Sequence, residues 1–151
     1  MAVSVSVSSE GVRAPLGRDR VLALVRAVAQ ADKVRDAMIS VTFVDSKFMT
    51  RLNRVHLGHA GSTDVISFAF REPVGSGVIV GDVYICPDVA REHAARLGLS
   101  VREETARLVV HGTLHVLGHE HPDGAGRTHS PMWVKQERLL QRLYSRARQS
   151  R

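Results

Sequence analysis

The sequence contains a single cysteine, Cys86, in 151 residues. One cysteine excludes an internal disulfide and any zinc site built from several thiolates. It is typical of a reducing compartment, so we expect a cytoplasmic protein. Aromatic residues make up only 5% of the chain. The sequence therefore offers no platform of aromatic rings on which nucleic-acid bases could stack.

Long apolar runs are also missing. No stretch approaches the roughly 18 apolar residues of a membrane span, and the N-terminus lacks the basic flank and apolar run of a secretory signal. We therefore expect no contact with a membrane. Hydrophobic residues still make up 44% of the chain. That share and the length predict a single domain over residues 1–151 with one core.

Acidic residues are scarce near the C-terminus, where most of the net charge of +6 lies. From Val134 onward Glu137 is the only acidic residue, against six basic ones, a local balance of +5; the basic residues are Lys135, Arg138, Arg142, Arg146, Arg148 and Arg151. Such a segment favours a polyanionic partner such as nucleic acid. A solvated helix face with a frayed tail is the alternative interpretation.

Apolar periodicity predicts strands and helices that alternate irregularly along the chain. Strands are predicted at 3–7, 36–45, 64–70 and 78–85, and helices at 18–31, 46–57, 87–97, 100–117 and from 131 onward. Turns or loops are predicted at 71–77 and 121–130, and Gly81 indicates a bulge or a close approach. Without a strict strand–helix–strand repeat, the pattern predicts an α+β fold, a small mixed sheet packed against about five helices.

Two of these helices have a recognisable apolar side. The helix that begins at Asp45 or Ser46 places Phe48, Leu52 and Val55 on one face. The helix after Pro87 is expected to bury a stripe that includes His93 and Leu97; the other members are Val89, Ala90 and Ala94. On this stripe we interpret His93 as a packing residue, without a role in chemistry.

The most informative stretch is HGTLHVLGHEH, residues 111–121. His111 and His115 are four residues apart, so on a helix their imidazoles lie one turn apart on the same face. Gly118 is expected to end the helix in the left-handed conformation, which turns His121 back towards them. Three neutral imidazoles leave a fourth tetrahedral position open, as in catalytic zinc sites. We therefore predict one zinc ion per chain, on a buried central helix.

The histidine beyond the turn has a competitor, His119. The metzincin peptidases space their histidines at relative positions one, five and eleven with glycine at eight, which favours His121. Gly112, however, stands where those enzymes carry a glutamate general base, and this disfavours a peptidase. Glu120, next to a predicted ligand, is a candidate proton carrier. Its alternative interpretation is a partly exposed turn carboxylate.

The histidine motif resembles the signature of the bacterial rRNA-maturation endoribonucleases of the YbeY type. Three further blocks resemble that family: LNRVHLGHAGSTDVISFAF (Leu52–Phe70), GDVYICPDVA (Gly81–Ala90) and MWVKQERLL (Met132–Leu140). The resemblance covers nearly the whole chain. It implies an α+β fold with a mixed four-stranded sheet and a zinc ion held by the three histidines of the motif.

The resemblance also implies a function in processing ribosomal RNA, notably the 3′ end of the small-subunit RNA, and in ribosome quality control. Its implied partners are the small ribosomal subunit and its assembly proteins. One position departs from the family, whose loop after the second predicted helix usually carries an arginine where this chain has Leu57. That arginine is implied to engage RNA or the transition state. Arg54 or Arg51, one turn back, is the candidate to replace it.

We therefore expect metal-assisted hydrolysis of an RNA phosphodiester. A zinc ion lowers the pKa of bound water to about 7, which makes the missing glutamate at Gly112 tolerable. Asp64 and Asp82 are candidates to orient ligand imidazoles, or else strand-end caps. The alternative function is a non-catalytic, zinc-stabilised assembly factor of the small subunit.

Overall fold

The computed structural model describes residues 2–58, 61–71 and 77–149, so positions 72–76 of the loop predicted at 71–77 lie outside the described residues. The strands are β1 (Val3–Glu10), β2 (Ala37–Val44), β3 (Val65–Arg71) and β4 (Ile79–Ile85). The helices are α1 (Arg18–Ala31), α2 (Ser46–Leu57), α3 (Pro87–Leu97), α4 (Val101–Val116) and α5 (Pro131–Gln149), with a short 3₁₀ helix η1 (Gly124–His129).

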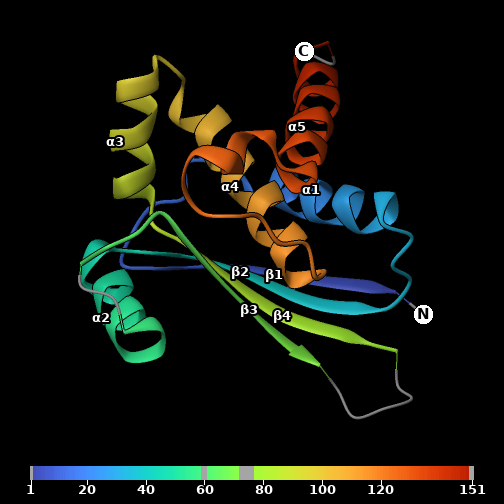
Figure 1. Ribbon diagram of the computed structural model, residues 1–151, viewed down its shortest axis with the longest axis horizontal. Coiled ribbons are helices and arrows are strands. Elements are labelled where there is room, and N and C mark those ends of the chain that lie inside the picture. Colours follow the sequence, from blue (N-terminus) through green and yellow to red (C-terminus); the bar gives the residue numbers. More distant parts are fainter. Residues whose placement is uncertain (1, 59–60, 72–76, 150–151) are drawn as a thin grey trace.

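The strands form one sheet in the order β1-β2-β4-β3. Strands β1, β2 and β4 run parallel, and β3 pairs antiparallel with β4. The described residues thus confirm the predicted α+β class, with a mixed four-stranded sheet and five α-helices. Figure 1 shows α1, α3, α4 and α5 above the sheet, and α2 apart from them at the left.

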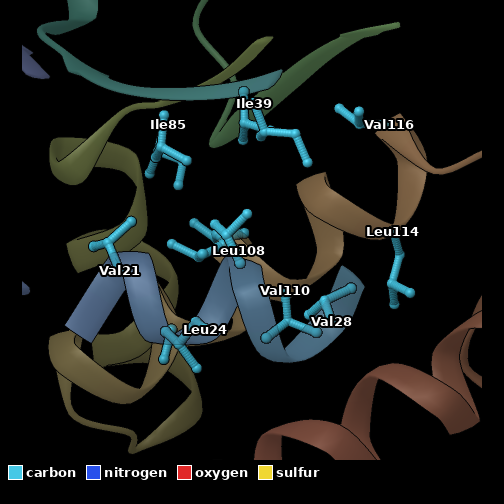
Figure 2. Close-up of a cluster of buried hydrophobic side chains, with 14 of the residues drawn as sticks. Val21, Leu24, Val28, Ile39, Ile85, Leu108, Val110, Leu114 and Val116 are labelled. Atoms are coloured by element: carbon cyan, nitrogen blue, oxygen red, sulfur yellow. The ribbon is translucent and has the colours of Figure 1, made fainter. Parts of the chain in front are cut away.

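The main core lies between the sheet and helices α1 and α4. Alternate residues of β2 point into it, because successive side chains of a strand face opposite sides; Ile39, Val41 and Phe43 are all buried. Figure 2 shows side chains of α1, such as Val28, and of α4, such as Leu108, gathered beneath the sheet residues. Nearly the whole second half of α4 is buried. This confirms the predicted central helix.

A second, smaller core lies on the other face of the sheet, under α2. Its buried members are Val44, Met49, Ile66 and Cys86. The predicted face of α2 is therefore partly wrong, because Val55 is 70% exposed, whereas Met49 and Asn53 are buried. The last turn of α2 still contacts the sheet through His56, whose ring centroid lies 5.2 Å from that of Phe68, so Val55 lies on the solvent side of the helix.

Two smaller predictions concern single positions. Leu97 is 66% exposed, contrary to the predicted stripe of α3, because it lies in the last turn, beyond the residues Ala90 and Ala94 that are buried. Gly81 confirms the predicted close approach: a methyl group there would lie 2.3 Å from Cγ1 of Val116.

The segment predicted as turn at 121–130 contains the short 3₁₀ helix η1. None of the described helices is long and apolar enough to cross a membrane.

Candidate metal centre

Helix α4 delivers two of the motif histidines and a tight reversal delivers the third. The Oγ atom of Ser100 caps the start of α4, accepting a hydrogen bond of 3.0 Å from the backbone N–H of Glu103. At the other end Gly118 has a φ of +102°, the left-handed region predicted for it. The N–H of His119 then bonds back to the carbonyl of Leu114 at 3.0 Å. The chain after α4 is therefore turned back along the helix.

This reversal brings His111, His115 and His121 together. One nitrogen of each ring lies within 4.8 Å of those of the other two. The ring centroids are 4.6 Å apart for the helical pair, and 5.1 and 4.9 Å from the third ring. His119 lies outside this group, because its Nε2 atom is 2.6 Å from Oδ2 of Asp32. Of the two histidines that compete for the third position, the geometry favours His121.

The outer nitrogen of each ring in this trio is already bonded. Nδ1 of His111 donates to Oε1 of Gln136 at 2.6 Å. Nδ1 of His115 donates to the carbonyl of His119 at 2.9 Å, and Nδ1 of His121 to that of Pro122 at 3.1 Å. Each Nε2 atom therefore carries the lone pair, the tautomer that a metal needs. Three such nitrogens and no thiolate fit a zinc ion.

Burial favours the neutral form of the two helical rings, His111 and His115. Burial lowers the pKa of His111 from 6.5 to about 4, although the hydrogen bond to Gln136 opposes this. Burial also lowers the pKa of His115, and repulsion from His121 adds to the effect. Neutral imidazoles at physiological pH can bind a cation without first losing a proton.

The residues that orient the imidazoles differ from those predicted. Asp64 pairs with Nδ1 of His93 at 3.2 Å, and Asp82 accepts a bond of 2.5 Å from Ser40. Neither bonds a ring of the trio in the described part of the chain, so the first of the two interpretations, that they orient the imidazoles, is wrong. Gln136 was missed. Its signal in the sequence is its spacing, four residues after Met132 and four before Leu140, which places a polar residue on the apolar face of this helix. In the structure Gln136 is 1% exposed.

The trio opens into a cavity of about 460 Å³. Its walls include Glu120, the predicted proton carrier, and Leu57, which stands where the resemblance implied an arginine. Arg54 is not among the described residues that line this cavity, and Arg51 lines a separate groove on α2. A cation that the sequence analysis missed, Arg127, completes the wall.

Gly112 packs directly against the sheet. A methyl group on it would lie 2.5 Å from Cγ1 of Val83 and 3.1 Å from Oγ of Ser67. The same Ser67 hydroxyl donates to the carbonyl of Gly112 at 3.1 Å. No larger side chain fits here without displacing the sheet, so a glutamate base at this position is incompatible with the packing. This supports the interpretation that the site is not a peptidase.

The described part of the basic C-terminal segment lies in α5, and part of it lines a second groove of about 700 Å³. Lys135, Arg138 and Arg142 lie along this groove with the apolar side chains of Val134 and Leu139. The predicted basic side chains at 146, 148 and 151 lie outside the described part of the structure. Lys135 also bonds Asp32, the partner of His119, so the groove borders the turn that carries the third histidine.

Known proteins resemble the chain in sequence and in fold. A family model described as Endoribonuclease YbeY matches residues 10–144. Endoribonuclease YbeY of Frankia casuarinae is 38% identical over 151 residues, which cover 91% of this chain and 73% of that protein. The Geobacillus kaustophilus protein of the same name is 38% identical over 130 residues, 80% of this chain and 82% of its own. The solution structure of TM1509 from Thermotoga maritima has a TM-score of 0.64 at 22% identity, over 97% of this chain and 93% of that one, which shows the shared fold.

Proposed function

The chain belongs to the YbeY endoribonuclease family, and from this premise we propose that it is a zinc-dependent single-strand endoribonuclease. Its proposed substrate is ribosomal RNA, cleaved during maturation of the 16S 3′ end and in ribosome quality control. Its proposed partners are the small subunit and its assembly proteins, in the cytoplasm. The observation that carries the proposal is the convergence of three imidazoles whose outer nitrogens are all bonded away from the cavity.

We propose that residues 1–151 act as one domain, with His111, His115 and His121 holding one zinc ion. A zinc ion held by these rings would activate water as a nucleophile near neutral pH and would polarise a phosphoryl oxygen. The chain contributes neutral rings fixed in one tautomer by Gln136 and by two backbone carbonyls. Glu120, an exposed carboxylate on the cavity wall, is the proposed carrier of the proton that the attacking water loses.

The basic groove on α5 is the proposed contact for the RNA backbone beyond the cleaved bond. Lys135, Arg138 and Arg142 present positive charge beside apolar side chains that cannot recognise a base by hydrogen bonds. Binding through such contacts releases counterions, so the affinity for RNA is expected to fall steeply with salt concentration. A titration of labelled single-stranded RNA at several salt concentrations measures this slope.

The proposal is tested by replacing one ring of the trio. We expect zinc-loaded protein to cleave a small-subunit rRNA precursor, and His115→Ala to lose cleavage while keeping the circular dichroism spectrum of the folded protein. His56→Ala is the control, since that exposed histidine lies on α2, outside the residues that line the cavity. Elemental analysis of the same samples gives the zinc content.

The competing functions give different results. A purely structural zinc predicts that His115→Ala unfolds and that the loaded wild-type protein binds the precursor without cutting it. A peptidase predicts cleavage of a protein substrate under the same zinc-replete conditions, with the RNA intact. Either result would overturn the nuclease proposal.

A further inference from the structure

Arg127 lies in η1 and lines the same cavity as the histidine trio. Its Nε atom is buried and has no hydrogen-bond partner. Within the described ranges no carboxylate forms an ion pair with its guanidinium group, and Glu120, an acidic residue in the same wall, is exposed to solvent. The cavity wall therefore includes a cationic residue with an unsatisfied buried donor and, among the described residues, no carboxylate counterion.

The Arg127 side chain and backbone both have contacts that hold them in place. Its Cζ atom lies 5.8 Å from the centre of the Trp133 ring, within the range of a cation–π contact. The carbonyl of Arg127 accepts hydrogen bonds from the Oγ of Ser130 at 2.8 Å and from its backbone N–H at 3.2 Å. Both the backbone and the head group of this residue are thus positioned before any ligand arrives.

Arg127 lines this cavity together with all three rings of the trio. It is the single arginine or lysine among the described residues that line the cavity, and the Leu57 side chain in the same lining is aliphatic. An anion that approaches the histidines therefore meets one fixed cation of protein origin.

We propose that Arg127 is a catalytic residue that binds a non-bridging phosphate oxygen of the RNA phosphodiester beside the histidine trio. This inference rests on the proposed nuclease function. Phosphate suits the site because a guanidinium is always charged and donates through a planar fork that matches two phosphate oxygens. An unpartnered buried donor destabilises the free protein, and an arriving phosphate removes that cost. The charge that builds up on the phosphate during cleavage would be stabilised by the same contact.

The test compares Arg127→Gln and Arg127→Lys with Arg96→Gln, which removes one positive charge from an exposed position on α3. In zinc-loaded protein we expect Arg127→Gln to lower kcat/KM for RNA cleavage by about ten- to a hundredfold. Arg127→Lys should recover part of the loss and Arg96→Gln should show none. Isothermal titration calorimetry with inorganic phosphate should rank the phosphate affinities of the zinc-loaded proteins in the same order as their kcat/KM values. The zinc content of the variants should be unchanged.

A role in packing alone is separated by chemical rescue. Guanidinium ion added to Arg127→Ala should restore part of the cleavage rate, which it cannot do for a residue that only supports η1. If Arg127→Ala fails to fold, a comparison of the phosphate affinities of Arg127→Lys and Arg96→Gln decides between a phosphate-binding role and a packing role. Wild-type protein that does not cleave RNA contradicts the proposed function itself. Wild-type cleavage with Arg127→Gln equal to Arg96→Gln in rate and in phosphate affinity overturns the role of Arg127 alone.

Discussion

The bond from His111 to Gln136 controls how the most buried ring of the trio faces its neighbours. Gln136 is 1% exposed and accepts at 2.6 Å, so no water can replace it without repacking α5. We expect Gln136→Leu to lower zinc affinity by about ten- to a hundredfold, the usual effect of losing a group that orients a ligand. Competition with a chromophoric chelator measures it. Gln141→Leu, at an exposed position of the same helix, is the control, and equal affinities for the two variants would contradict the assignment.

Gly112 explains how α4 comes so close to the sheet. An added methyl group would press on Val83 at 2.5 Å, and crowding of this kind in a packed core costs about 1–3 kcal/mol. We therefore expect Gly112→Ala to lower the free energy of unfolding by that amount in urea denaturation. Gly17→Ala is the matched control, because nothing lies within 4 Å of its added methyl group. If both variants unfold at the same urea concentration, the close packing is not what requires glycine here.

At the scale of whole elements, Asp32 joins three parts of the fold. It caps the end of α1, and its carboxylate bonds His119 in the turn after α4 and Lys135 on α5. Burial alone would raise the pKa of Asp32, but the hydrogen bonds from Lys135 and His119 outweigh it and lower the pKa. The carboxylate is therefore charged at neutral pH and holds the turn that leads to His121.

We expect Asp32→Ala to loosen this turn. The carbonyl of His119 orients His115, so displacement of the turn disturbs two of the three rings. Zinc affinity should fall by about tenfold, and the free energy of unfolding by about 1–3 kcal/mol through loss of charged hydrogen bonds. Asp19→Ala, in the first turn of α1, is the control. A loss of stability without a change in zinc affinity would show that Asp32 supports the fold and not the metal centre.

The contrast between local and distant contacts decides what the sequence could predict. The helix with His111 and His115 and the left-handed Gly118 depend on spacing within a few residues, so their signals stand in one short stretch. Asp32 lies 87 residues from its partner His119, and nothing local marks the pair. The exposed Val55 has the same origin, since which side of a helix is covered depends on the sheet it meets.

At the scale of the molecule, the two hydrophobic cores are complete without a metal ion. Their members come mainly from the sheet and the five α-helices, and none of them is a ring of the trio. We therefore expect chelation of zinc to abolish RNA cleavage. It should lower Tm only by the amount that zinc binding adds to the stability of the folded protein, and unfolding should remain a single cooperative transition. Differential scanning calorimetry with and without chelator measures both. Loss of the transition on chelation would instead mark the zinc as structural.

The metal-free protein should also have a characteristic dependence on pH. The pKa of His111 is about 4 in the folded chain and 6.5 in its ordinary state. Above pH 6.5 both states are neutral, so the ring has no effect; as the pH falls towards 4, the unfolded chain takes up the proton first and is favoured. The free energy of unfolding should fall by about 3 kcal/mol over this interval, at roughly 1.4 kcal/mol for each unit of pKa difference, and His111→Gln should flatten the profile. Urea denaturation across this pH range measures it, with His56→Gln, exposed on α2, as the control. If the profile of His111→Gln is as steep as that of the wild type, another group accounts for the loss of stability.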